Sequence, residues 1–280
     1  MRLVQFALKR TPQKVNVGVQ LSNDTIIDLG HHLKKPDLTM RSFLGLGQDG
    51  MKVARELIKG GASSASTVDA KQVVLKSPIF EPQKIICVGM NYRDHCIEQN
   101  APIPTEPVLF SKFASSIISP GENIILDETQ ELDYEVELAI VIGKSGKKIP
   151  RERAMEYVAG FTVAHDVSAR DWQLKRNGGQ WMLGKTFDTF CPLGPALVTP
   201  DALPKGPHEL GIRCYLNDKL VQDSNTRELI FKTEDVIAWC SRFFTFVPGD
   251  VILTGTGPGV GVFRKPPLFL KVCFWRGLSQ

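Results

Sequence analysis

Two acidic residues stand where a predicted strand turns from half-buried to buried, a placement that favours metal ligands. Glu135 and Glu137 lie two positions apart in residues 132–142, which alternate apolar and polar side chains before becoming apolar throughout. Because a strand repeats every two residues, both carboxylates point to one face and repel each other unless a cation lies between them. The alternative is a half-buried strand with a solvated acidic face, but the apolar residues 139–142 favour the mouth of a buried strand.

A third carboxylate, Asp166, follows the apolar residues 161–164. Residues 168–171 then have the spacing of a capping box that opens a helix, so the alternative role of Asp166 is to assist the start of that helix. Three carboxylates without neighbouring Cys or His pairs favour oxygen-seeking cations over zinc. We therefore predict one divalent ion, Mg²⁺ or else Ca²⁺ or Mn²⁺, on Glu135, Glu137 and Asp166.

Lys185 lies in the segment Gly-Lys-Thr-Phe-Asp near the predicted metal ligands in chain order. Its ammonium group is suited to hold a substrate carboxylate or an enolate oxygen. The alternative is an exposed lysine in a glycine turn.

His95 and Glu98 form a second pair of groups that could move protons. Three residues apart on a helical turn, they face the same way, so the carboxylate can orient the imidazole and stabilise its charge. The pair matches neither a zinc HExxH motif nor a hydrolase triad, and no GxSxG is present. The alternative is an exposed pair without a catalytic role.

The glycine-rich residues 255–261 invite a comparison with nucleotide-binding loops. They contain neither a Gly-Lys-Ser/Thr ending nor a GxGxxG register that opens a helix, and Pro258 disfavours a helix start there. We expect instead a tight loop whose backbone approaches a small ligand.

The elements that must position these residues fall into two regions of different texture. Residues 1–75 alternate short strands with a helical patch at 51–59 and end in a Gly-Ala-Ser stretch at 60–66, which predicts a small N-terminal α+β domain. From about Pro82, short β-rich runs recur between turns. Strands are expected at 84–88, 134–142, 158–164, 212–216 and 250–254, and helices at 168–175 and 233–243. This order indicates an α+β protein with a β-rich catalytic domain over residues 82–280, rather than a doubly wound sheet.

The composition disfavours nucleic-acid and membrane partners. The 280 residues carry 34 basic and 30 acidic side chains, and the densest basic run, residues 143–148, has the pattern of a solvated hairpin tip. No apolar stretch reaches membrane-span length, and the six dispersed cysteines indicate reduced thiols in an intracellular protein. The basic residues 1–10 fit either a mitochondrial transit peptide or a first strand paired with residues 15–19, and we prefer the strand.

The order of the motifs resembles the fumarylacetoacetate hydrolase family from about Lys84 to Lys271. The motifs are Cys-Val-Gly-Met-Asn-Tyr-x-x-His-x-x-Glu, Tyr-Glu-Val-Glu-Leu, His-Asp-Val-Ser-Ala-Arg-Asp-Trp-Gln, Gly-Lys-Thr-Phe-Asp and Gly-Thr-x-Pro-Gly-Val-Gly. The likeness looks closest to the second fumarylacetoacetate-hydrolase-domain-containing subgroup of animals. It implies a mixed, barrel-like β-roll catalytic domain and a homodimer. For that subgroup it further implies mitochondria and, in some members, conversion of enol-oxaloacetate to its keto form.

The resemblance also implies roles for individual residues. It places Mg²⁺ or Ca²⁺ on the positions that match Glu135, Glu137 and Asp166. Lys185 and Gln173 match residues that face the substrate, and Thr256 matches a loop residue that contacts the substrate carboxylate. His95 and Glu98 match a dyad on a mobile lid that activates water in hydrolytic members. Arg170 and Asp171 match the family's helix and look more structural than catalytic.

These observations predict an enzyme that acts on small 2-oxo acids through a metal-stabilised enolate. A 2-oxo acid chelates a cation through its carboxylate and adjacent carbonyl oxygens, and the cation stabilises the enolate that forms. That enolate is shared by an oxaloacetate keto–enol tautomerase and by a C–C hydrolase or decarboxylase of oxaloacetate or acylpyruvates. The sequence does not choose between these outcomes.

The alternative is an impaired family member with a binding or interaction role, and two departures from the family support it. Gly257 stands where the family usually has proline, which would loosen a substrate loop. The family also continues past Lys271 with a Gly-Asp turn and closing strands, whereas residues 272–280 here lack that pattern. The resemblance therefore predicts that the closing strands are missing and that the fold is poorly stable without them.

Overall fold

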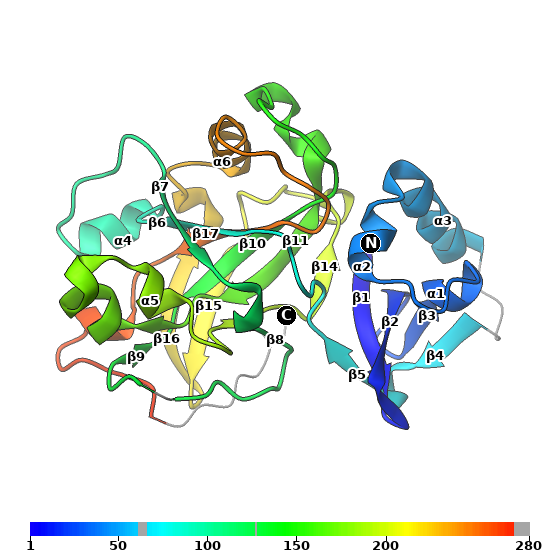
Figure 1. The fold of residues 1–280 in the computed structure, drawn as a ribbon, viewed down its shortest axis with the longest axis horizontal. Helices are drawn as coiled ribbons and strands as arrows, with labels where there is room; N and C mark the ends of the chain where they lie inside the picture. The colour runs from blue at the N-terminus through cyan, green and yellow to red at the C-terminus, as the bar shows by residue number, and fades with distance from the viewer. Residues whose placement is uncertain (61–65, 127, 272–280) are drawn as a thin grey trace.

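The computed structural model describes residues 1–60, 66–126 and 128–271. Figure 1 shows a large, mostly sheet-built region with a smaller N-terminal region at one end. Most of the linker expected at 60–66, and the divergent residues 272–280, lie outside the described residues.

One mixed sheet runs through both regions in the order β4-β3-β2-β1-β14-β11-β10-β17-β6-β7, with β5 also paired to β1. In the N-terminal region the strands are β1 (Arg2–Leu8), β2 (Thr11–Gln20), β3 (Thr25–Asp28), β4 (Thr67–Asp69) and β5 (Val73–Lys76). The larger region supplies β6 (Ile85–Gly89), β7 (Val108–Lys112), β10 (Val136–Ile142), β11 (Val158–His165), β14 (Ala196–Val198) and β17 (Val251–Thr256). Every residue of β10 and β17 is buried, which explains why apolar residues fill most of β10 and the first half of β17.

The predicted α+β class and mixed sheet are confirmed. β17 runs parallel to β6, whereas β10 pairs antiparallel with both β11 and β17. Within the described residues the sheet path ends at β4 and β7, so these strands form an open sheet and not a closed barrel. Three two-stranded sheets flank it: β9 (Leu132–Asp133) with β12 (Ser168–Ala169), β8 (Ile117–Ile118) with β13 (Cys191–Pro192), and β15 (Gly211–Leu216) with β16 (Lys219–Asn225).

The α-helices are short and lie mostly at the periphery of the sheet (Figure 1). They are α1 (Leu29–His32), α2 (Met40–Leu44), α3 (Gly47–Gly60), α4 (Arg93–Glu98), α5 (Met182–Lys185) and α6 (Thr233–Cys240). Short 3₁₀ helices cover Ala70–Gln72, Ala114–Ser116, Arg151–Tyr157, Asn177–Gly179, Pro200–Ala202, Thr226–Glu228 and Gly261–Phe263. None of the helices in the described part of the chain is long and apolar enough to cross a membrane.

The helix expected at residues 168–175 is partly wrong. Ser168 and Ala169 form strand β12 against β9, and only Asp171–Lys175 coils, as one π-helical turn. The Ser168 hydroxyl donates to the Asp166 carbonyl at 2.9 Å, so it does not cap a helix. The nearby β9 therefore outcompetes the local capping signal. Residues 143–148 lie, mostly exposed as predicted, in the connection between the antiparallel strands β10 and β11, but the Arg151–Tyr157 segment makes this connection longer than a tight hairpin turn.

The two regions share one hydrophobic core. Leu3 and Val17 of the N-terminal region belong to the same buried cluster as Cys87, Ala139 and Leu253 of the central strands. In addition, β1 pairs directly with β14. The division into domains at residues 1–75 and 82–280 stays a prediction.

Candidate metal centre and its neighbours

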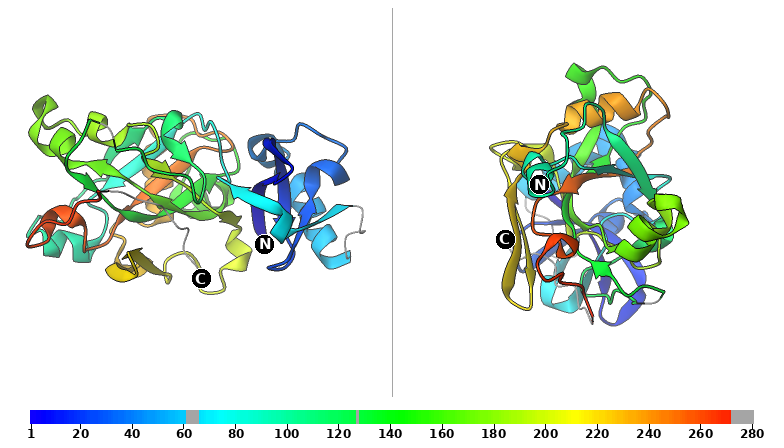
Figure 2. Two further views of the ribbon diagram at one scale, coloured as in Figure 1. Left: turned by 90° about the horizontal axis from the view of Figure 1, so that it is seen from below. Right: turned by 90° about the vertical axis from the view of Figure 1, so that its left-hand side faces the viewer.

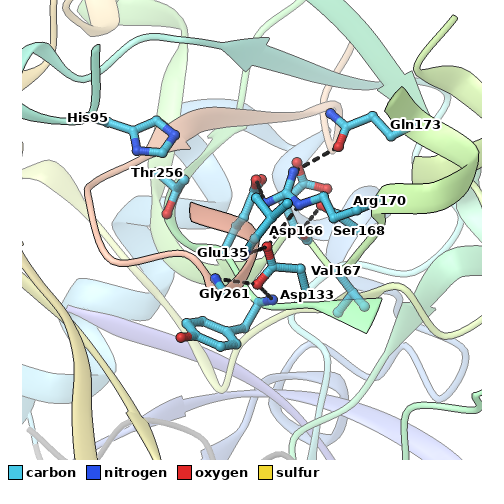
Figure 3. Close-up of polar contacts among 12 residues, drawn as sticks. His95, Asp133, Glu135, Asp166, Val167, Ser168, Arg170, Gln173, Thr256 and Gly261 are labelled. Carbon is cyan, nitrogen blue, oxygen red and sulfur yellow. Dashed lines mark hydrogen bonds and ion pairs between the residues drawn. The ribbon is translucent and has the colours of Figure 1, made fainter. Parts of the chain in front are cut away.

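The three predicted metal ligands lie together at one end of the central strands, and Figure 3 shows two of them, Glu135 and Asp166. Glu135 directly precedes β10, Glu137 is its second residue, and Asp166 directly follows β11. Because β10 and β11 are antiparallel, with Val136 opposite His165, the start of one strand meets the end of the other. One oxygen from each carboxylate lies within 4.8 Å of the others, and all three side chains are buried.

Two buried lysines bind these carboxylates. Lys185 Nζ donates to Glu135 Oε2 at 2.9 Å and to Asp166 Oδ2 at 2.6 Å. Lys112, from β7, lies 2.7 Å from Asp166 Oδ1 and donates to the carbonyls of Val167 and Lys185. The sequence analysis considered Lys185 but missed Lys112, whose only local signal is a charged residue closing an apolar strand.

Arg170 is a third cationic side chain that binds carboxylates of this cluster. Its guanidinium donates to Glu135 at 2.6 Å, to Asp133 at 2.8 Å and to the Gln173 side-chain oxygen at 2.7 Å (Figure 3). Burial raises the pKa of Glu135, but the adjacent Lys185 and Arg170 charges more than offset it and hold that pKa well below its usual range. Glu135 is therefore an ionised carboxylate with one cationic side chain on each of its oxygens.

Glu137 has a different environment. Within the described residues the Glu137 carboxylate accepts one hydrogen bond, from the Gly255 backbone N–H at 2.7 Å. No lysine or arginine in these residues forms an ion pair with the carboxylate. Burial, followed by the charges of Asp166 and Glu135, raises the pKa of Glu137 well above its usual range. A buried carboxylate in this position either takes up a proton or shares a cation with its neighbours.

The donor set therefore fits a divalent cation. Three carboxylates offer only oxygen, which suits Mg²⁺, Mn²⁺ or Ca²⁺. Each carboxylate has about four lone-pair sites, so the bonds to Lys185 and Arg170 leave acceptor capacity on Glu135 and Asp166. That these residues hold the ion stays a prediction.

His95 and Glu98 contact each other as their spacing predicts. The His95 Nδ1 atom lies 3.0 Å from Glu98 Oε2, and the side-chain nitrogen of Gln99 contacts the other ring nitrogen. Burial raises the pKa of Glu98, but the hydrogen bonds from His95 and from the Gly259 backbone N–H lower this pKa by more than burial raises it. The pKa of Glu98 therefore lies below its usual range. The pair thus has an ionised carboxylate that orients a buried imidazole.

The glycine-rich loop connects the dyad to the carboxylate cluster. Its backbone N–H groups donate to three acidic side chains: Gly255 to Glu137, Gly259 to Glu98 at 2.9 Å, and Gly261 to Asp133 at 2.6 Å. Gly255 and Gly259 have φ values of +97° and +101°, which glycine adopts readily. The loop is bound by protein carboxylates at three points, which the sequence analysis did not foresee.

The two predicted substrate-binding residues lie on opposite sides of this cluster (Figure 3). Gln173 accepts from Arg170 through its oxygen, and its amide nitrogen points away from that bond. Thr256 is the last residue of β17 rather than a loop residue; its hydroxyl donates to the Val136 carbonyl at 2.9 Å and accepts from Gln222 at 2.8 Å. In this arrangement the Thr256 hydroxyl proton is already used within the protein.

The chain is similar to known proteins over most of its length. Residues 84–272 match the family described as the C-terminal domain of fumarylacetoacetate (FAA) hydrolase. The chain is 56% identical over 273 residues to a Xenopus laevis protein named oxaloacetate tautomerase fahd2, mitochondrial, covering 97% of this chain and 84% of that one. It is 55% identical over 275 residues to the human protein named oxaloacetate tautomerase FAHD2A, mitochondrial, covering 97% and 85%.

Solved structures agree with the fold. A fumarylacetoacetate hydrolase from Exiguobacterium antarcticum superposes with a TM-score of 0.80 at 32% identity, covering 97% of this chain and 92% of that chain. A maleylpyruvate hydrolase from Sphingobium sp. SYK-6, in complex with manganese(II) and pyruvate, superposes with a TM-score of 0.76 at 29% identity, covering 96% and 91%.

Proposed function

The chain belongs to the fumarylacetoacetate hydrolase family, and from this premise we propose that it interconverts enol- and keto-oxaloacetate through a metal-stabilised enolate. We further propose that Glu135, Glu137 and Asp166 hold the divalent ion, with Mg²⁺ as the first candidate and Mn²⁺ or Ca²⁺ as alternatives. The observation that carries the proposal is the buried carboxylate cluster with Glu137 unpaired by any described cation.

The charge of the buried cluster favours an anionic ligand beside the metal. Its carboxylates are Asp133, Glu135, Glu137 and Asp166, and its cations are Lys112, Arg170 and Lys185. With all of them ionised the cluster carries one surplus negative charge, and a divalent ion turns this into one surplus positive charge. Since a buried charge without a partner is costly, the loaded site is best completed by an anion such as a 2-oxo acid.

The chain's own residues supply orientation and proton transfer. A divalent ion on the three carboxylates would act as a Lewis acid that stabilises negative charge on the substrate enolate. Lys185 donates to Glu135 and Asp166 and thereby orients both carboxylates, and the amide nitrogen of Gln173, for which the described residues supply no acceptor, is available to donate to substrate. His95, oriented by Glu98, is the candidate for moving a proton to and from the substrate carbon.

Tautomerisation is favoured over C–C hydrolysis by the relatives. The proteins named oxaloacetate tautomerase are 53–56% identical to this chain, whereas the maleylpyruvate hydrolase is 29% identical. Tautomerisation moves a proton between oxygen and carbon and consumes no water, so it needs the dyad but no water held against the carbonyl. The relatives named as mitochondrial also support a mitochondrial location, which immunodetection in fractionated cells tests.

The decisive experiment follows the loss of the ultraviolet absorbance of enol-oxaloacetate with the purified chain. We expect acceleration with Mg²⁺ or Mn²⁺ and none after chelation. Parallel assays for pyruvate release from oxaloacetate and from acylpyruvates separate decarboxylation and hydrolysis from tautomerisation. Rapid pyruvate release with no tautomerase activity would replace the proposal by a hydrolase or decarboxylase, and no turnover of any of these acids would reject it.

A further inference from the structure

Gln222 is a buried side chain that none of the preceding roles requires. It belongs to β16, in the β15–β16 hairpin that lies against one face of the large sheet (Figure 2), and it is 2% exposed. Its neighbour Val221 is buried as well, so the strand departs here from the alternation of a half-exposed hairpin. A polar side chain in this setting is expected to have specific partners.

All three bonds of the Gln222 amide go to the segments that carry the metal site. Its oxygen accepts from the Val136 backbone N–H at 2.9 Å. Its nitrogen donates to the Thr256 hydroxyl at 2.8 Å and to the Gly257 carbonyl at 3.1 Å. Val136 is the residue between Glu135 and Glu137.

These bonds lie where the backbone ladder between β10 and β17 is irregular. The register between the two strands shifts between Glu137 and Ala139. Here side chains take over: the Thr256 hydroxyl donates to the Val136 carbonyl at 2.9 Å, and the Thr254 hydroxyl donates to the Leu138 carbonyl at 2.8 Å. Both the N–H and the carbonyl of Val136 are therefore held by side chains, Gln222 and Thr256, that also bind each other.

We propose that Gln222 is a positioning residue that sets the spacing of Glu135 and Glu137 for the divalent ion. The peptide of Val136 links these two predicted ligands, so its orientation determines where both carboxylates project. Gln222 fixes that peptide against the end of β17 across a gap that the backbone alone leaves open. The inference rests on the proposed metal site and adds to it a residue that contacts neither the ion nor the substrate.

The test compares two buried glutamines. In Gln222→Met the side chain keeps its approximate volume but loses all three bonds. Gln5 offers a matched control, because it is 3% exposed, donates to the Ser77 carbonyl at 2.7 Å and accepts from the Met40 N–H at 3.2 Å, in the N-terminal region. We expect both Met variants to lower the melting temperature of the metal-free protein. Only Gln222→Met should weaken Mn²⁺ binding, measured by calorimetry, by about 10–100-fold, as changes around metal ligands typically do.

A double-mutant cycle locates the effect. Thr256→Val removes the hydroxyl that Gln222 binds, so we expect the losses of Mn²⁺ affinity in Gln222→Met and Thr256→Val to be smaller together than their sum. If Gln222→Met does not fold, Gln222→Asn, which keeps the amide but is one methylene shorter, is measured in its place with the same expectation.

The outcomes separate this inference from the proposed function. Wild-type chain that binds no Mn²⁺ would overturn the metal site and, with it, the role of Gln222. Wild-type chain that binds Mn²⁺, with unchanged affinity in the Gln222 variant, would overturn only the role of Gln222. Equal loss of affinity in Gln5→Met and Gln222→Met would show general destabilisation and reject a positioning role.

Discussion

At the scale of single residues, Lys185 and Glu137 have complementary positions in the carboxylate cluster. Lys185 is fully buried, and although burial lowers its pKa, Asp166 and Glu135 raise that pKa above its usual value, so the ammonium group stays charged. It therefore neutralises Glu135 and Asp166, while none of the cationic side chains in the described part of the chain forms an ion pair with Glu137. The asymmetry makes Glu137 the residue whose charge depends most on the metal.

Glu137→Gln is accordingly expected to lower Mg²⁺ or Mn²⁺ affinity by at least about 100-fold, the upper end of what changes around the ligands cost. The metal-free variant should melt no lower than the metal-free wild type, because the substitution removes a repelled carboxylate and an amide oxygen can still accept from Gly255. Calorimetric titration and melting curves measure both effects. Glu156→Gln, at an exposed position, is the control, and equal metal affinity in the two variants would rule out Glu137 as a ligand.

His95→Ala should lower kcat for oxaloacetate tautomerisation by about 10²–10⁴-fold, the usual contribution of a general acid–base group. Metal affinity should stay at the wild-type value, because the ring contacts Glu98 and Gln99 rather than the carboxylate cluster. Steady-state kinetics and a metal titration of the same preparation give both readouts. Wild-type kcat in this variant would show that the dyad does not transfer the proton.

Glu98 should contribute to stability in a pH-dependent manner. Its pKa in the folded chain lies below the unfolded value of about 4.3, so the stabilisation is present above that pH and is lost as the pH falls through the folded pKa. Glu98→Gln keeps an oxygen for the Gly259 N–H but cannot titrate. Melting temperatures of the metal-free proteins should therefore fall less steeply below about pH 5 in the variant; parallel curves would mean that Glu98 is unperturbed.

At the scale of elements, the glycine-rich loop joins groups that are far apart in the sequence. Its backbone N–H groups donate hydrogen bonds to Glu98 of α4, Glu137 of β10 and Asp133 of β9. The loop also packs tightly on β16: a Cβ on Gly257, where family resemblance predicts proline, would meet Ser224 Cβ at 2.6 Å. Ser224 in turn donates to Asp94 in α4. Movement of the loop would therefore disturb the dyad and the carboxylate cluster together.

Gly259→Ala tests this coupling. The new Cβ would lie 2.1 Å from the Val221 carbonyl oxygen at a φ of +101°, so the loop must shift and the Gly259–Glu98 hydrogen bond must lengthen. We expect loss of about 1–3 kcal/mol of stability together with a lower kcat. Gly206→Ala is the matched control, since Gly206 has a φ of +72° but nothing within 4 Å of a Cβ. It should cost about 1–2 kcal/mol and leave kcat unchanged; equal kcat in both variants would contradict the coupling.

At the scale of the whole molecule, the N-terminal region and the central strands are joined by a continuous sheet and a common core. Figure 2 shows the N-terminal strands at one end of the sheet that carries the site. The shared burial of Leu3 with the central strands indicates that the two regions unfold together. The expected homodimer stays a prediction, which analytical ultracentrifugation tests.

Leu3→Ala distinguishes one cooperative unit from two domains. Leu3 is fully buried, so the substitution should cost about 2–5 kcal/mol. If the regions unfold together, calorimetry will show one transition shifted to lower temperature. Leu21→Ala, in the same region but 41% exposed, should shift it little. A second, low-temperature transition in Leu3→Ala, with the remainder of the protein unchanged, would support separate domains at residues 1–75 and 82–280.

The sequence by itself determined what depends on short spacings. The period of two in residues 132–142 indicated that Glu135 and Glu137 lie together at the mouth of a buried strand, although the expected single strand is divided into β9 and β10 and Glu135 lies just before β10. The three-residue spacing of His95 and Glu98 predicted their contact. Strand periodicity likewise indicated the α+β class and the positions of seven strands, β1, β2, β6, β10, β11, β15 and β17, but not those of the shorter strands between them. The same local reasoning failed at residues 168–171, because a capping signal cannot show that β9 is available as a pairing partner.

Only the tertiary structure decided how charge is balanced and how the ligands are held. Lys112 of β7 contacts Asp166. Arg170 binds Glu135, which lies 35 positions earlier in the sequence, and Gln222 binds Val136, which lies 86 positions earlier. These partners come from segments whose neighbours are set by the packing of the whole sheet. No periodicity in a single strand encodes such pairings, because the free energy of each buried contact depends on which distant groups desolvate it.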